Sequence, residues 1–169
     1  MKRTEWFNRT FPPIADNGLL PGIIERIEGT PARLRYKLAN RDGEIINKLH
    51  EGKWTIKKEV VHLIILEDLW KTRIKQFAED TEELHPADLT NRATHESELD
   101  QLPLRHLLDL FENDRKDLVV QLRALDEASL LHSSLHPRLK QPMRAIDMAN
   151  FVAEHDDHHL AQITALLAE

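Results

Sequence analysis

The chain contains no cysteine. This absence excludes disulfide bonds, thiolate metal ligands and a cysteine nucleophile in a single step. Any thiol chemistry would therefore need a thiol from outside the chain. Glycine is also scarce, with 5 residues among 169. Such a composition suits a helix-rich globular protein better than an all-β or a disordered one.

Positive charge and long apolar runs are lacking as well. The formal net charge is -6, and because nucleic-acid binding draws its affinity from clustered Lys and Arg, we expect no nucleic-acid partner. No apolar run approaches the ~20 residues that a membrane span requires. The segment Met1–Arg9 is too polar for a signal peptide. The expectation is a soluble, cytoplasmic protein with no membrane partner.

What is present fits one folded unit. The chain has 169 residues, of which 41% are hydrophobic and 31% charged, and this is the usual size of a single domain. No long flexible linker interrupts it. We therefore expect a single helical domain over residues 1–169, with an irregular N-terminal arm over residues 1–18 that contains the pair Pro12–Pro13.

Apolar residues recur at helical spacing along most of the remaining chain. Thr30 fits an N-cap with Pro31 at the first helical position, and Thr55 can cap the helix that follows it. The pattern predicts helices from Leu19 to Gly29, from Thr30 to about Arg41, around Ile45–Leu49, from Ile56 to about Phe77, from Pro103 to about Leu125, and from Met143 to Leu167. Residues 79–101 and 129–142 are expected to be loops. The expected fold class is all-α, a four-helix bundle with an additional short N-terminal helix and long loops.

The last predicted helix carries polar residues on its inward stripe. Steps of four and three place these residues in line: Met148, Val152, His155, His159, Gln162 and Leu166. His155 and His159 project from the same face, where two imidazoles can chelate one ion. The divalent ions that favour imidazole, chiefly Zn, Ni, Cu and Fe, need at least one more protein ligand to be held firmly.

His62 is the best candidate for that third ligand. It lies within the most apolar run of the chain, Val60–Leu66, where an imidazole without a partner would be costly. The alternative is a histidine satisfied by a hydrogen bond, and for His62 taken alone the two interpretations are evenly balanced. The pair on the last helix favours the metal, because packing does not explain two polar residues on a core stripe.

Other polar residues near these histidines are candidates for supporting roles. His158 lies partly off the inward stripe, so we expect it at the edge of the site or behind one of the ligands. Asp156 and Asp157 could orient ligand imidazoles, although acidic residues on a helix are more often solvated. Glu59 and Asp156 are the candidates for a general base. The role of Gln162 stays open.

A dinuclear site is the structural rival. Two motifs have the spacing of di-iron carboxylate bundles: Glu59-x-x-His62 and Asp156-x-x-His159. Such a site also requires inward carboxylates on the two remaining helices, where Glu112 is the obvious candidate and Asp114 a poorer one. It leaves His155 without a role. We therefore favour a mononuclear site with three histidines.

Three segments carry a resemblance to a known family: Gly29-Thr30-Pro31-Ala32-Arg33-Leu34, then Lys53-Trp54-Thr55-Ile56 leading to His62-Leu63, and Ala153–Ile163 with its His155-Asp156-Asp157-His158-His159 core. With them the chain resembles the DinB-like superfamily of metal-binding four-helix proteins. That superfamily includes S-transferases that use bacillithiol or mycothiol, and metal-dependent hydrolases. The resemblance implies metal ligands at His62, His155 and His159, the residues that burial and spacing also select. It further implies an open metal position, Zn or Ni as the metal, and a homodimer.

The sequence thus predicts a metal-dependent enzyme, either a hydrolase or a low-molecular-weight-thiol S-transferase, with a small-molecule substrate. Three neutral imidazoles would hold Zn or Ni, with Fe or Mn as further candidates. They would leave positions for water or a small-molecule thiolate. The alternative from another class is a non-catalytic, stress-associated metal-binding scaffold.

Overall fold

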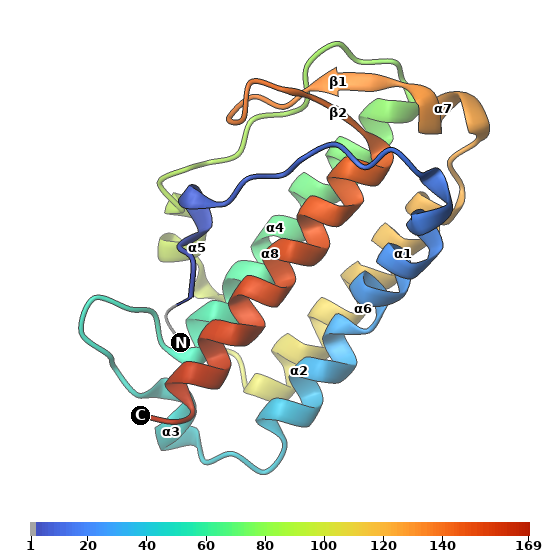
Figure 1. The fold of residues 1–169 in the computed structure, drawn as a ribbon. Helices are drawn as coiled ribbons and strands as arrows, with labels where there is room; N and C mark the ends of the chain where they lie inside the picture. Colours follow the sequence, from blue (N-terminus) through green and yellow to red (C-terminus); the bar gives the residue numbers. More distant parts are fainter. Residues whose placement is uncertain (1–2) are drawn as a thin grey trace.

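Four helical columns stand side by side in the computed structural model, which describes residues 3–169 (Figure 1). The first column consists of α1 and α2, and the others are single long helices: α1 Leu20–Glu28, α2 Thr30–Leu38, α4 Ile56–Ala78, α6 Leu104–Arg123 and α8 Ala145–Leu166. In Figure 1, α4 and α6 run in one direction, and α8 and the α1–α2 column run in the other. The predicted all-α four-helix bundle is confirmed.

The α1–α2 column explains the place of the short N-terminal helix. Gly29 keeps nearly helical backbone angles, φ -75° and ψ -11°, so α1 leads directly into α2. Both α1 and α2 pack against α6 and α8. The short helix is therefore part of the bundle wall, and α2 continues it after Gly29.

The helix ends agree with the sequence in some places and differ in others. The Thr55 side chain accepts a hydrogen bond from the Lys58 amide at 3.1 Å and caps α4 as predicted. The prediction of Thr30 as an N-cap is wrong, because its side chain caps nothing and Thr30 is itself helical. The helix also ends at Leu38 rather than Arg41, since Asn40 takes a left-handed conformation with φ 58°.

The connections contain short elements that apolar periodicity does not reveal. The long link between α4 and α6 holds α5 (Arg92–Glu96) and a 3-10 turn, Glu98–Gln101. The chain between α6 and α8, expected as a loop over residues 129–142, holds a short helix and a small antiparallel sheet: α7 Glu127–Leu131, β1 Ser133–Leu135 and β2 Pro142–Arg144. Because β2 includes Met143, the last helix begins at Ala145 and not at Met143. The arm has two 3-10 turns, Trp6–Asn8 and Asn17–Leu19, and α3 spans Gly43–Asn47. The two regions predicted as loops are thus partly ordered, in pieces too short for a period to repeat.

The core is divided in two by a polar layer. One cluster of buried hydrophobic residues lies toward the β1–β2 end and includes Phe77 and Phe151, and a second lies toward the chain's C-terminal end and includes Phe111 and Ile163. Between them, buried polar side chains meet from three columns: Glu59, His62, Glu67, Arg115, His155, Asp156 and His159. In the part of the chain that the structure describes, no helix is long and apolar enough to cross a membrane.

A candidate metal centre

Three imidazoles converge in the polar layer. His62 comes from α4, and His155 and His159 come from successive turns of α8. His155 Nε2 lies 3.4 Å from His62 Nε2 and 3.1 Å from His159 Nε2. Ligand nitrogens about 2.0–2.1 Å from a tetrahedral zinc ion lie ~3.3 Å from one another. Two of the three separations are close to this value, and the ligand atoms of all three histidines lie within 4.8 Å of one another.

The three histidines are buried, and burial sets their charge. It lowers the pKa of His62 to about 2 and that of His159 to about 4, and it brings the pKa of His155 well below its usual value. The neighbouring histidines lower the pKa values of His62 and His155 further, because a second positive charge nearby is unfavourable. All three rings are neutral at pH 7 and offer lone pairs, as metal ligands must.

Two of the rings are oriented from their outer nitrogens. His159 Nδ1 lies 2.5 Å from Glu59 Oε2, and His62 Nδ1 lies 3.0 Å from Thr94 Oγ1. Both contacts point Nε2 of the same ring toward the common centre. Burial raises the pKa of Glu59 to about 8, and a dication beside His159 would act in the opposite direction. Glu59, a candidate base in the sequence, therefore contacts the outer nitrogen of His159.

Thr94 was not predicted as part of the site. It lies on α5, within the segment 79–101 that the sequence indicates only as a polar loop. Its side chain is 1% exposed, although its sequence neighbours are mostly polar. No pattern in the sequence distinguishes it from other threonines, so only the path of the connection reveals its role.

Asp156 faces away from the three imidazoles. Its carboxylate is paired with Arg115 of α6 and accepts a hydrogen bond from the Thr30 hydroxyl at 2.7 Å. Arg115 in turn lies 2.5 Å from Glu67 of α4. Asp156 is completely buried, so it is not a solvated helix residue. It joins α8 to α6 and α2, and the structure does not bring it to the cavity side of the histidines.

Three other predicted neighbours of the site occupy its surroundings. Asp157 turns to the outside, where Arg26 and Arg33 each lie 2.6 Å from it. His158 is half-buried and lines the cavity beside the centre, in agreement with a place at its edge. The Gln162 side-chain oxygen accepts from Arg3 of the arm.

The carboxylates of a dinuclear site are all engaged elsewhere. Among residues 3–169, the group of converging metal-binding side chains consists of the three histidines alone. Glu59 contacts the outer nitrogen of His159. The other three carboxylates form ion pairs: Asp156 with Arg115, Glu112 with Arg35, and Asp114 with Lys71. The converging group among the described residues therefore contains three histidines and no carboxylate.

The fourth side of the centre is open to a cavity of about 210 Å³. All three histidines line it, together with side chains from the arm, α4, the segment before α5, the β1–β2 loop and α8. The chain has three tryptophans, and all three pack on ligand rings. Trp6 and Trp70 lie 5.1 and 5.4 Å from the His155 ring, and Trp54 lies 4.8 Å from the His62 ring. The cavity wall is thus largely aromatic next to the nitrogens.

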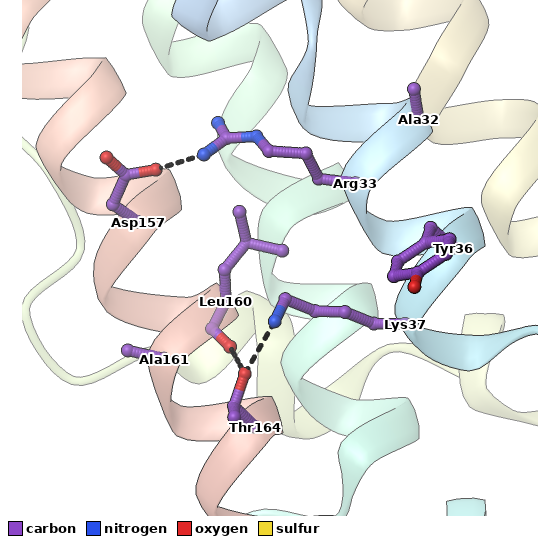
Figure 2. A pocket seen from close by; sticks show the side chains of 8 residues that line it. All are labelled: Ala32, Arg33, Tyr36, Lys37, Asp157, Leu160, Ala161 and Thr164. Atoms are coloured by element: carbon purple, nitrogen blue, oxygen red, sulfur yellow. Dashed lines mark hydrogen bonds and ion pairs between the residues drawn. The ribbon is translucent and has the colours of Figure 1, made fainter.

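A wider groove of about 800 Å³ lies on the outside of the molecule, between α2 and α8 (Figure 2). Its lining includes Arg33, Lys37 and the exposed ring of Tyr36, with Asp157 and Thr164 across from them. It contains none of the three converging histidines. The groove and the metal centre are therefore separate features on opposite sides of the α8 backbone.

Comparison with known proteins assigns the family. The model of the DinB superfamily matches residues 26–163, which include the three histidines. The chain belongs to the DinB superfamily. In this DinB chain the matched range begins after the arm. It therefore does not include Trp6, which contacts His155.

A solved structure agrees with the DinB assignment. YfiT from Bacillus subtilis is similar to this chain with a TM-score of 0.79 and 20% sequence identity, over 94% of this chain and 91% of YfiT. That protein is described as a probable metal-dependent hydrolase with an unusual four-helix bundle topology. At this identity the likeness establishes the shared fold. The search of curated proteins finds no match.

Proposed function

We propose that this DinB protein is a metal-dependent enzyme that acts on a small molecule. His62, His155 and His159 would hold one divalent transition metal, with Zn or Ni as the first candidates and Fe or Mn as further ones. The observation that carries the proposal is the convergence of three neutral Nε2 atoms on one wall of a cavity. A structural site has four protein ligands, whereas a catalytic one keeps a position for water or substrate.

The donor set fits such an ion. Three imidazole nitrogens suit Zn, Ni and Fe, and no thiolate is present to favour a softer metal. His155 Nδ1 is buried and has no hydrogen-bond partner among the described residues, while its Nε2 faces two other nitrogens. A metal at Nε2 would satisfy a ring that is otherwise poorly paired.

The residues around that ion would have different roles. When bound, a divalent cation supplies a Lewis acid that lowers the pKa of a ligand on its open side. Glu59 and Thr94 hold the rings of His159 and His62 in place. Trp6 and Trp70 limit the access of water to the cavity side of His155. A dry, pre-oriented site of this kind strengthens electrostatic interactions with a substrate.

Hydrolysis is the first candidate reaction, since the structurally similar YfiT is described as a probable metal-dependent hydrolase. Transfer of an external low-molecular-weight thiol is the second. One observation favours it: Asp88 is the only carboxylate lining the cavity among the described residues, and its oxygens accept from the backbone amides of Thr90 and Arg92. Thiolate attack needs no carboxylate base, because the same positive centre stabilises a thiolate.

Metal content tests the site. The purified protein is expected to carry about one equivalent of metal, and the His155→Ala, His159→Ala double variant almost none. The matched control replaces two exposed histidines, His85 and His106, by alanine and should keep the metal. Equal metal content in both double variants would overturn the proposed ligand set.

Activity assays separate the reaction classes. Activated esters and amides are tested without thiol, and electrophiles are tested with low-molecular-weight thiols that include bacillithiol and mycothiol, each with and without a chelator. Chelator-sensitive turnover without thiol identifies a hydrolase, and turnover only with thiol identifies an S-transferase. Absence of chelator-sensitive turnover in a metal-loaded protein contradicts the proposal and favours the non-catalytic scaffold.

A further inference from the structure

The cavity has a second polar wall away from the three histidines. It is built from Arg73 of α4 and from His136 and Arg138 of the loop that joins β1 to β2. Arg73 is 1% exposed and His136 is equally buried, while Arg138 is half-buried. None of these side chains has a role in holding the proposed metal.

Arg73 is only partly hydrogen-bonded. Its Nε donates to the His85 carbonyl oxygen at 2.8 Å, and its Nη2 is buried without a partner among the described residues. Arg138 Nη2 is likewise buried without a partner there. Buried guanidinium nitrogens are nearly always paired, because leaving one unpaired costs most of its hydration energy. Both side chains line the same cavity, and two such unpaired nitrogens point to a missing acceptor.

His136 adds a third donor to this wall. The backbone amides of Arg138 and Leu139 both donate to its Nδ1, each at 3.2 Å. Burial lowers the pKa of His136 to about 4, so the ring is neutral at pH 7 and its Nε2 carries the hydrogen. This Nε2 lies 3.2 Å from Arg73 Nη1, which is also a donor. Neither Arg73 Nη1 nor His136 Nε2 has a carboxylate or carbonyl partner among the described residues.

The charge of the wall is equally unbalanced. Neither Arg73 nor Arg138 belongs to an ion pair among residues 3–169, whereas most of the other described arginines do. Asp88, the carboxylate that lines the same cavity, is exposed and caps the turn before α5. Two uncompensated positive charges in a partly dry cavity favour a negatively charged occupant.

Aromatic rings hold both guanidinium groups. Arg73 Cζ lies 5.6 Å from the centre of the Trp70 ring, and Arg138 Cζ lies 5.2 Å from that of Phe7 and 5.8 Å from that of Phe151. Such contacts restrict the arginine rotamers and leave the N–H edges available for planar, bidentate recognition. A carboxylate has the matching planar geometry.

We propose that Arg73 and Arg138, with the His136 Nε2–H group, form a carboxylate-binding subsite, so that the substrate of the metal centre is a small organic acid with an apolar body. The carboxylate would take the unpaired guanidinium nitrogens, and the apolar body would lie along the aromatic wall toward His155. The size of the cavity, about 210 Å³, suits a compact acid. The assignment of this acid as a substrate rests on the proposed function, but the anion subsite itself does not need the metal.

Binding of a model acid tests the subsite. Benzoate and its neutral analogue benzamide are titrated by calorimetry into the metal-stripped protein, which removes direct binding of the carboxylate to a metal. Benzoate is expected to bind at least about tenfold more tightly than benzamide. Equal binding of the two compounds, or no saturable binding of benzoate, would overturn the proposal.

Two variants locate the binding. Arg138→Gln, at a half-buried position, is expected to weaken benzoate binding about tenfold or more, as is Arg73→Gln if circular dichroism shows that it folds. The control is Arg123→Gln, which removes one positive charge from the outer face of α6, where Arg123 pairs with Glu28 at 2.7 Å. Unchanged affinity in Arg138→Gln, or an equal loss in Arg123→Gln, contradicts the subsite.

Failure of the proposed function gives a different result. The His155→Ala, His159→Ala variant is titrated with benzoate in the same way. If this variant binds benzoate and the native protein holds no metal, the proposed metal enzyme fails and the anion subsite stands. If the native protein holds metal and benzoate binds only to the metal-loaded form, the subsite fails and the metal centre stands.

Discussion

Each of the three converging histidines is hydrogen-bonded at its second ring nitrogen to a different degree. His159 has the carboxylate of Glu59 and His62 the hydroxyl of Thr94, whereas His155 Nδ1 has no hydrogen-bond partner among the described residues. Partners at this outer position fix the tautomer and raise the basicity of the metal-binding nitrogen. His159 has the strongest outer partner, so we expect removal of that partner to have the largest effect on metal binding.

Glu59→Gln is therefore expected to weaken metal binding. The amide keeps a hydrogen-bond acceptor for His159 Nδ1 but cannot take the negative charge that a bound dication would favour on Glu59. Loss of such a partner typically costs about 10–100-fold in affinity. Competition with a chromophoric chelator measures this change. Glu44→Gln, at an exposed position of α3, is the control and should bind metal as the native protein does. Equal affinities in the two variants would show that Glu59 does not position the ligand.

His136 makes stability depend on pH in a definite direction. Its pKa is about 4 in the folded protein because the ring is buried, against 6.5 for the unfolded chain. As the pH falls, the unfolded state binds the proton first. The contribution of His136 to the free energy of unfolding is therefore complete above pH ~6.5 and is lost as the pH falls toward ~4. It amounts to about 3 kcal/mol in total. Urea unfolding of the metal-stripped protein at pH 7 and pH 4.5 measures it. His136→Asn should reduce this acid sensitivity, and an unchanged pH dependence would contradict the assignment.

At the scale of elements, the buried ion pairs in the polar layer connect three of the four columns. Arg115 of α6 contacts both Glu67 of α4 and Asp156 of α8, and its guanidinium also donates to the Ile27 carbonyl oxygen at 3.0 Å. Removing one partner of a buried pair leaves a charge without compensation. The layer therefore aligns α8, and with it the two histidines of α8 that face His62.

Asp156→Asn is expected to lower the free energy of unfolding by about 3 kcal/mol, because Arg115 then keeps Glu67 as its only carboxylate partner. Asp157→Asn is the matched control on the next residue of the same helix. Asp157 is partly exposed and pairs with Arg26 and Arg33, so its loss should cost less than about 1 kcal/mol. Urea unfolding measures both values, and comparable losses would contradict the special place of Asp156.

The N-terminal arm packs over the three-histidine cluster and is expected to slow the exchange of the proposed metal. Trp6 packs edge-on against both His155 and Phe151, at 5.1 and 5.0 Å. Trp6→Ala should speed the release of metal to a chelator several-fold and cost about 1–2 kcal/mol of stability. Tyr36→Ala, which removes a ring that is 86% exposed, should change neither quantity. Unchanged release from the Trp6 variant would show that the arm does not limit access.

For the whole molecule, the two hydrophobic clusters on either side of the polar layer determine how the protein responds to metal loss. Their buried side chains hold the four columns together without any contribution from the ligands. Chelation is therefore expected to leave the helical circular dichroism spectrum intact and to lower Tm by about 5–10 °C, as loss of a ligand bound at about 100 times its Kd would. Complete unfolding of the metal-stripped protein at 25 °C would instead identify a structural site.

Local features of the sequence accounted for most of the fold. The helices were predicted close to their observed ends, because apolar periodicity and caps such as Thr55 act over a few residues. The short sheet Ser133–Leu135 with Pro142–Arg144 was missed, since three residues do not establish an alternating pattern. The inward direction of His155 and His159 follows from helical spacing alone.

Contacts between distant segments were decided by the tertiary structure. His62 lies 93 positions before His155, and only the packing of α4 on α8 brings their nitrogens to 3.4 Å. The same packing turns Asp156 toward Arg115 and brings Thr94 onto His62. Helical spacing determines which residues share a face, but which faces meet, and which polar groups remain unpaired there, depends on how the elements pack. The inward pair His155 and His159 was thus determined by helical spacing, and the sequence also indicated His62 through its apolar surroundings. The approach of His62 to that pair, the outer partners and the arginine wall were decided by the fold, because they depend on contacts between distant segments.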